Sequence, residues 1–181
     1  MKTPLYLFLF LFFCASVQAQ FIPLTGIPDQ SSATYKLVHP LHEIEATSKE
    51  VEYHATIDPA NRTIERVTAT VDVTTFDSGN SNRDSHAMEV VDALTYPDVT
   101  FTATKIISNG QITTVKGQLT FHGVTDDIVA TVTPVWSDSA VSFTGGFNIS
   151  LTQFKIDRPS LLMIPVSDTL HFTLKTAFRW K

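Results

Sequence analysis

A two-residue alternation of apolar and polar side chains recurs along most of this chain and constrains its fold more than any other feature. It is clearest in the segment 169–178, where four of the even-numbered positions are apolar: Leu170, Phe172, Leu174 and Phe178. Successive side chains of a β-strand point to opposite faces, so this period predicts a strand with one buried face. About eight such segments, joined largely by short turns, predict an all-β fold of antiparallel strands.

The alternation by itself leaves two architectures open, a sandwich of two sheets and a single barrel. Both bury one face of each strand and expose the other, so their sequence patterns are alike. The pair Gly145-Gly146 lies in the middle of one expected strand. Glycine at that place suggests a bend or a bulge, which a closing barrel needs.

One short helix is expected inside the strand pattern, around residues 82–94. The stretch 77–80, Asp-Ser-Gly-Asn, stops the preceding strand, and Ser81 or Asn82 can cap the helix. Apolar residues recur within it at helical spacing, at Ala87, Val90, Val91 and Leu94. We expect this helix to lie across one end or side of the fold, with Ala87, Val91 and Leu94 buried.

The first 19 residues read as a secretory signal peptide. Lys2 gives a positive start, an apolar run follows from 5 to 14, and Ala19 is a small residue at the cleavage position. The mature protein is therefore expected to be periplasmic or secreted. No later stretch approaches the roughly 20 apolar residues of a membrane span, so no transmembrane anchor is expected after cleavage. Cys14 is the only cysteine, and its loss with the signal removes disulfides and thiolate sites from consideration.

The rest of the chain is expected to form an irregular lead-in over 20–32 and a single domain over 33–181. Removing Lys2 leaves 12 basic residues against 18 acidic ones, so the net charge moves from −5 to −6. This balance argues against nucleic acid as a partner and against electrostatic adhesion to anionic lipid.

Two motifs carry a family resemblance. The first is D-S-G-N-x-x-R-D-x-H from Asp77 to His86, followed by Tyr96-Pro97 and Phe101. The second is Gly117, Leu119 and Thr120, followed by His122-Gly123-Val124-Thr125. Through these motifs the chain resembles the YceI-like family from Ala33 to Phe178. The resemblance implies an eight-stranded lipocalin-like antiparallel barrel, in secreted or periplasmic proteins that bind long polyisoprenoid lipids. A closed barrel of about eight strands is just wide enough to hold one ligand.

Aromatic residues on the apolar strand faces are the main candidates for ligand binding. Together with one leucine they are Phe101, Phe121, Phe143, Phe147, Phe172 and Leu174. They would line a cavity if the barrel interior is open, or fill it if the interior is closed, because apolar packing looks the same in sequence. The resemblance favours an elongated tunnel for a long-chain isoprenoid or a similar lipid.

Arg83, Asp84 and His86 form the densest polar group of the chain. In one interpretation, Arg83 and His86 ring the mouth of a pocket and meet the polar head of a ligand. In the other, Asp84 caps the helix and Arg83 pairs with a neighbouring carboxylate, which would fix the helix on the barrel.

The histidines offer little support for a metal site, which needs converging ligands. The only close pair among the six is His39 and His42, whose spacing on one strand would put the two rings on opposite faces. We therefore expect no metal or other cofactor, and a hydrogen-bonding role for His39 near a barrel end. No nucleophile elbow, phosphate loop or paired-histidine zinc helix is present, so no catalysis is expected. The alternatives are a lipid-modifying enzyme in the same barrel and a ligand-free interaction or stress-response protein.

One segment departs from the family pattern. Many members have an arginine and then an aromatic-glycine pair just after the strand that here ends at Ile149. In this chain Phe154 supplies the aromatic residue, Leu151 stands at the place of the arginine and Lys155 at the place of the glycine. The resemblance therefore does not imply that this segment contacts the head group of a ligand.

The apolar run Leu161–Val166 lies between the last two expected strands, where a polar loop is the default. One interpretation is a plug that closes the barrel end, since exposed apolar runs are costly. The other is a pocket lid or a portal that touches a membrane, and the adaptable side chain of Met163 suits either.

Overall fold

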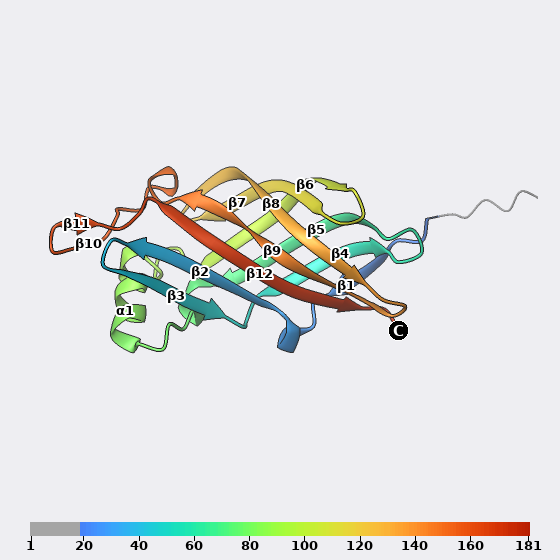
Figure 1. Ribbon diagram of the computed structural model, residues 1–181, viewed down its shortest axis with the longest axis horizontal. Coiled ribbons are helices and arrows are strands. Elements are labelled where there is room, and N and C mark those ends of the chain that lie inside the picture. Colours follow the sequence, from blue (N-terminus) through green and yellow to red (C-terminus); the bar gives the residue numbers. More distant parts are fainter. Residues whose placement is uncertain (1–18) are drawn as a thin grey trace, which may run out of the picture.

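The alternating segments form strands in residues 19–181, the part of the chain that the computed structural model describes. Residues 1–18, which hold nearly all of the predicted signal peptide, lie outside the described residues. Ten strands form one antiparallel sheet in the order β1-β4-β5-β6-β7-β8-β9-β12-β2-β3, and a separate hairpin pairs β10 with β11 (Figure 1). No helix among the described residues is long and apolar enough to cross a membrane.

The strands of the large sheet are β1 (Ile22–Thr25), β2 (Ser32–His39), β3 (His42–Ser48), β4 (Glu52–Asp58), β5 (Thr63–Asp72), β6 (Asp98–Ser108), β7 (Thr113–Phe121), β8 (Val124–Trp136), β9 (Ala140–Ser150) and β12 (Thr169–Arg179). The separate hairpin consists of β10 (Ser160–Leu161) and β11 (Ile164–Pro165). The helical elements are η1 (Pro28–Gln30), η2 (Val73–Thr75), α1 (Ser81–Val90) and η3 (Thr152–Phe154).

The sheet curls into a lipocalin-like antiparallel barrel, which confirms the predicted fold class, but it has ten strands rather than eight. The two strands that the alternation missed are β1 and β3, the two edges of the sheet. β1 lies inside the segment expected to be irregular and contains Pro23, which an edge strand tolerates because proline has no amide to donate. β3 has a weak apolar pattern, with Ile44 as its one large apolar residue.

The edge strands β1 and β3 do not pair with each other, so short contacts from neighbouring segments close the barrel. After β1, the amide of Gly26 donates to the carbonyl of Tyr53 on β4, and the amide of Ile27 donates to the carbonyl of Ala177 on β12. On the other side, Thr47 of β3 exchanges two backbone hydrogen bonds with Asp77, at 3.0 and 3.1 Å. The barrel is thus joined at its gap by a few bonds rather than by a full strand ladder.

The helix α1 lies at the end of the barrel where β2 finishes at His39 and β7 at Phe121, here called the α1 end (Figure 1). Its cap is Asn80, whose side chain accepts from the amide of Arg83 at 3.2 Å, rather than the predicted Ser81 or Asn82. Asn80 has the extended backbone that a cap requires.

The predicted burial of Leu94 is wrong, because α1 ends at Val90 and Leu94 is 100% exposed. Asp92 has a positive φ of 47°, which breaks the helical spacing and turns Ala93 inward instead. Val91 is half-buried and packs against the core cluster, as do Met88 and Val90. The helix is therefore docked on the barrel, but not through the last residue of the predicted apolar face.

The apolar run 161–166 does not plug the barrel, which corrects one of the two expectations for it. All of this run except Val166 belongs to the hairpin β10-β11, which begins at Ser160 and extends beyond the α1 end of the barrel (Figure 1). Residues 161–164 are exposed, and only Val166 of this run is buried.

The glycine pair in β9 does not mark a bulge, because the register of β9 against β12 is unbroken from Ala140 to Ser150. The register shifts of the sheet lie elsewhere, after Thr56 in β4 and after Ala103 in β6. A Cβ at Gly145 would collide with the backbone carbonyl of Thr131 and lie 2.6 Å from the Cα of Val132. Glycine here permits a close approach of neighbouring strands.

Replacing Gly145 with alanine should therefore destabilise the barrel, because the added methyl group meets backbone rather than a movable side chain. We expect the free energy of unfolding to fall by about 1–3 kcal/mol, measured by denaturant titration. Thr144→Ala on the exposed face of the same strand is the matched control, with an expected loss below about 1 kcal/mol. Equal losses in the two variants would contradict the close-approach argument.

Candidate functional site

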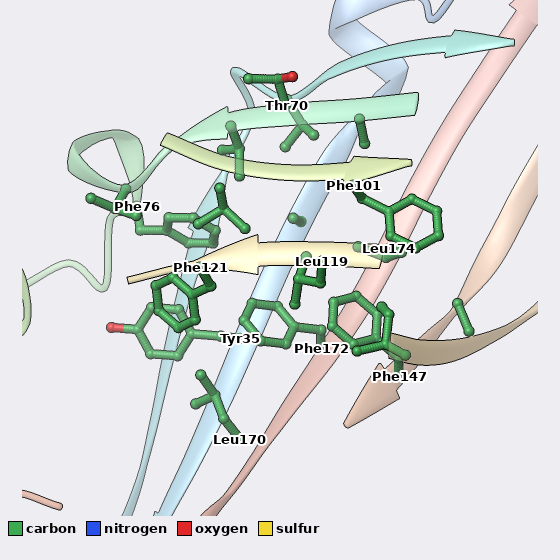
Figure 2. A pocket seen from close by; sticks show the side chains of 18 of the residues that line it. Tyr35, Thr70, Phe76, Phe101, Leu119, Phe121, Phe147, Leu170, Phe172 and Leu174 are labelled. Carbon is green, nitrogen blue, oxygen red and sulfur yellow. The ribbon is translucent and has the colours of Figure 1, made fainter. Parts of the chain in front are cut away.

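The interior of the barrel contains a cavity of about 260 Å³, lined by side chains from the sheet strands and from α1. Figure 2 shows part of the lining from the strands. A cavity of roughly 150 Å³ already holds a benzene molecule, so this space can hold part of an apolar ligand. The interior is therefore open rather than filled, a choice that the sequence left undecided.

The predicted ligand-binding residues converge on this cavity. Its lining includes all six apolar candidates, Phe101, Phe121, Phe143, Phe147, Phe172 and Leu174. Phe147 and Phe172 are direct neighbours across β9 and β12, and their rings stack at 4.9 Å between centroids and 13° between planes (Figure 2). The structure shows that all six residues line the same cavity. Their contact with a ligand stays a prediction.

Four of these six side chains are only half-buried, although they point into the barrel. Phe147 and Phe172 belong to this group, whereas Phe121 and Phe143 are buried. The exposed part of an inward side chain faces the cavity itself, because no other side chain fills that space. Apolar surface is therefore left unburied at the centre of the molecule, where a ligand could cover it.

The polar group of α1 also reaches the cavity, since Arg83, Asp84 and His86 all belong to its lining. The guanidinium of Arg83 donates to the hydroxyl and to the carbonyl of Ser78, both at 2.8 Å, rather than to a carboxylate. Asp84 accepts from the amide of Ser78 at 3.2 Å and from its hydroxyl. These two side chains thus fix the segment before the helix, while Asn80 provides the cap that sequence reasoning gave to Asp84.

His86 is exposed and still lines the cavity, so the cavity reaches the surface beside α1. Its Nδ1 lies 3.6 Å from the carboxylate of Glu89, one helical turn further on. Arg83 and His86 thus both line the cavity, and Arg83 in addition holds Ser78; their contact with the polar head of a ligand stays a prediction.

Tyr35 is a lining residue that sequence reasoning missed. Its ring lies 5.4 Å from that of Phe76, and Figure 2 shows its hydroxyl turned away from the Phe147–Phe172 stack. Burial raises the pKa of the Tyr35 hydroxyl; the Asp84 carboxylate raises it further, and the Arg83 guanidinium acts in the opposite direction. The phenol therefore remains a neutral hydrogen-bond donor near the polar group of α1. Its alternation with Ala33 and Leu37 was the signal that could have found it.

The segment that departs from the family pattern forms part of the cavity wall. Leu151, at the place of the arginine, is 4% exposed and lines the cavity, and Phe154 is buried behind it. Lys155, at the place of the glycine, has a φ of 57°, in the left-handed region that glycine favours. The backbone geometry of a glycine position is thus kept here without the glycine.

His39 and His42 do not lie on opposite faces, as their spacing on one strand predicted. They pair directly across the hairpin of β2 and β3, whose turn is Pro40-Leu41, and their ring centroids are 5.2 Å apart. His39 is 2% exposed, its Nε2 lies 3.0 Å from the carbonyl of Ile164, and its Nδ1 accepts from the amide of Leu41 at 3.2 Å. This confirms its predicted hydrogen-bonding role. Within residues 19–181, no group of three or more His, Cys, Asp or Glu side chains is placed to hold a metal ion.

Comparison with known proteins identifies a family to which most of this chain is similar. Residues 25–178 match the YceI-like domain. A UPF0312 protein of Vibrio cholerae is 34% identical over 109 residues, which is 55% of this chain and 57% of that protein. Protein YceI of Escherichia coli O157:H7 is 26% identical over 118 residues, 61% of this chain and 62% of that protein. The chain thus aligns with only about three fifths of the length of these relatives.

Solved structures share the fold. Burkholderia cenocepacia BcnA superposes with a TM-score of 0.73 at 22% identity, over 81% of this chain and 95% of that one. A Saccharophagus degradans domain described as polyisoprenoid binding and implicated in plant cell wall breakdown gives 0.62 at 11% identity, over 90% and 100%. At these identities the likeness shows the fold alone.

Lys155→Gly should stabilise the protein, because the left-handed backbone is strained for lysine and open to glycine. After the entropic cost of glycine is subtracted, we expect the free energy of unfolding to rise by about 0.5–1 kcal/mol. Lys175→Gly, in the regular strand β12, is the control and should lower it by a similar amount. A loss of stability in both variants would show that Lys155 is not strained.

Two inward tyrosines, the buried Tyr53 and the half-buried Tyr35, should make the fold sensitive to alkaline pH. Burial raises the pKa of Tyr53 and, as the main cause, that of Tyr35 above the ordinary value of 10.0. Above about pH 10 the unfolded chain loses these protons while the folded chain keeps them, so the free energy of unfolding falls as the pH rises. Below that pH their contribution is fully present.

Tyr53→Phe should flatten this alkaline decline, measured as the free energy of unfolding against pH between 9 and 12. The limiting slope for one tyrosine is about 1.4 kcal/mol per pH unit. The hydroxyl of Tyr53 donates to the carbonyl of Ser32 at 3.2 Å, so the variant starts from a lower stability at neutral pH. An unchanged slope would contradict the assignment.

Proposed function

This chain belongs to the YceI-like domain family, and we propose that it binds a long-chain polyisoprenoid or similar apolar lipid in its barrel, as a periplasmic or secreted carrier without catalysis. The observation that carries the proposal is the open apolar cavity, whose inward phenylalanines are left partly uncovered. The description of the Saccharophagus degradans domain as polyisoprenoid binding supports the same ligand class.

The lining suits the chain of such a lipid rather than a polar substrate. An isoprenoid chain is apolar and flexible, so its affinity comes from removing its surface from water, at about 25 cal/mol per Å². Ordering the chain and the loss of its free motion oppose that gain. Aromatic walls such as the Phe147–Phe172 stack offer large, rigid surfaces for this contact.

The opening beside α1 is the place for a polar head. Tyr35 offers a neutral donor there, and Arg83 and His86 lie at the same margin. Arg83 already holds Ser78, so its charge would act on a head group alongside that structural bond. In the proposed pose the chain lies inside the barrel and the head stays near these residues, where water remains accessible.

Titration of prenols of increasing chain length into delipidated protein tests this proposal. Each further buried methylene is worth up to about 0.8 kcal/mol, roughly fourfold in affinity, until the chain is longer than the cavity. Affinity should change little with salt, because no ion pair is formed with the chain. Affinity that stays flat with chain length, or no binding to folded protein, would contradict the proposal.

A matched pair of variants on β8 separates the cavity from the surface. Ala130 is buried and lines the cavity, whereas its neighbour Val129 points outward and is exposed. Ala130→Phe should fill the space and weaken binding by about tenfold or more, while Val129→Phe should leave binding unchanged. Thermal unfolding checks that both are folded, and Ala130→Leu replaces the larger change if it does not fold. Equal affinity of the two variants would place the ligand outside the barrel.

A further inference from the structure

The hairpin β10-β11 carries an apolar tip that points away from the barrel (Figure 1). At its tip Leu162 is 75% exposed and Met163 is 97% exposed, and the flanking Leu161 and Ile164 are exposed too. From Pro159 to Val166 no residue carries a charge. An exposed apolar run of this kind needs a physical reason, because each of its side chains orders water without packing.

The turn of this hairpin is costly in a second way. Leu162 and Met163 have φ values of 52° and 65°, both in the left-handed region. Two-residue hairpin turns with two positive φ values strongly favour Asn-Gly or similar pairs, which relieve this strain and are polar. Here two large apolar side chains take both positions, so backbone and hydration both disfavour the tip in water.

The base of the hairpin is held firmly, so the tip is presented in a defined place. The carbonyl of Ile164 lies 3.0 Å from His39 Nε2, and the amide of Ser167 donates to the carbonyl of Val38 at 2.7 Å. The amide of Val166 donates to the carbonyl of Pro159 at 3.0 Å, and the Nε of Arg158 donates to the carbonyl of Val166 at 2.9 Å. The first two bonds tie the β11 leg to β2, and the last two join the two legs to each other at their base.

We propose that this hairpin docks the protein on a lipid bilayer, with Leu161–Ile164 inserted at the interface between head groups and acyl chains. Each leg has two residues at about 3.3 Å per residue, so the tip lies roughly 7 Å beyond its base. Apolar faces of interfacial segments are buried by about 5–10 Å, which fits this length. Leu161 and Ile164 face each other as a pair of the β10-β11 ladder, which limits the number of unpaired backbone groups in the apolar layer.

A bilayer fits this tip better than a second copy of the chain. A stable protein interface buries about 800 Å² on each partner, and a narrow, convex tip of four residues offers much less. The net charge, −5 for the full chain and −6 without the predicted signal peptide, argues against electrostatic attraction to anionic lipid as the driving force. The tip therefore requires apolar insertion, which a bilayer with zwitterionic head groups provides.

Two neighbouring features share the α1 end with the hairpin. Leu41, in the turn of β2 and β3 beside His39, is exposed, and so is Leu94 after α1. Pro159, at the root of the hairpin, also lines the cavity. Docking by this end would bring the cavity close to the bilayer, and this consequence rests on the proposed function, in which the cavity takes up a membrane lipid.

The test uses the protein with vesicles of phosphatidylcholine alone. Flotation should recover the wild-type protein with the vesicles at both low and high salt, and the double change Leu162→Ser and Met163→Ser should reduce partitioning at least tenfold. The matched control is Val129→Ser with Val135→Ser, which removes two exposed apolar side chains from β8 and should leave partitioning unchanged. Absence of the wild-type protein from the vesicle fraction would overturn the proposal.

A tryptophan at the tip reports insertion directly. The fluorescence of Met163→Trp should shift to the blue and be quenched by brominated acyl chains, while Val129→Trp should show neither change. Equal quenching of the two variants would overturn the proposal. Analytical ultracentrifugation would also overturn it if the wild-type protein is a dimer and the Leu162→Ser, Met163→Ser protein is a monomer, because the tip would then be a contact between two copies.

Failure of docking can be told apart from failure of the lipid-binding function. The serine variant should bind a prenol in solution, without vesicles, within twofold of the wild-type affinity, because its changes lie outside the cavity. Loss of prenol binding by the wild-type protein, with vesicle insertion intact, would reject only the function proposed for the cavity.

Discussion

The two edges of the curled sheet do not meet as a strand ladder, and this incomplete closure is the constraint on which the rest of the structure depends. Gly26 and Ile27 join β4 to β12 on one side, and Thr47 joins β3 to Asp77 on the other. Because the segment 77–80 takes part in closure, the residues that fix it become structural. Arg83 and Asp84 hold Ser78 within that segment, so the polar group at the opening of the cavity also helps to hold the barrel closed.

An open cavity in a small barrel has a cost in stability, since its lining lacks the contacts that a filled core would provide. The half-buried Phe147 and Phe172 show where these contacts are missing. A ligand that covers them would favour the folded state by mass action, so the apo and bound proteins would differ in stability. The same residues would thus account for both the binding energy and the incomplete packing of the free protein.

The sequence predicted the parts of the structure in which local pattern and packing agree. The period of two predicts inward faces for Phe147 and Phe172, and the pairing of β9 with β12, which the sequence did not predict, makes them direct neighbours. The alternation did not predict the edge strands β1 and β3. An edge strand pairs on one side only, so it tolerates Pro23 in β1 and a weak apolar pattern in β3. Leu94 and the pair His39–His42 were misplaced for a different reason. In both cases a turn, at Asp92 or at Pro40-Leu41, changed the direction of the chain within a segment read as continuous.

The topology also has a consequence for the order in which the barrel can form. Strands β4 to β9 follow one another in sequence and in the sheet, so each pairs with a neighbour that is close along the chain. β2, near the start of the described chain, reaches the sheet only through β12, which covers residues 169–179. Pairing of this kind joins residues far apart in sequence and is slow, because a long loop must close first. The barrel therefore cannot close until β12 has been made, and a protein interrupted before residue 169 would leave β9 with a partner on one side only and the β2-β3 hairpin detached from the meander.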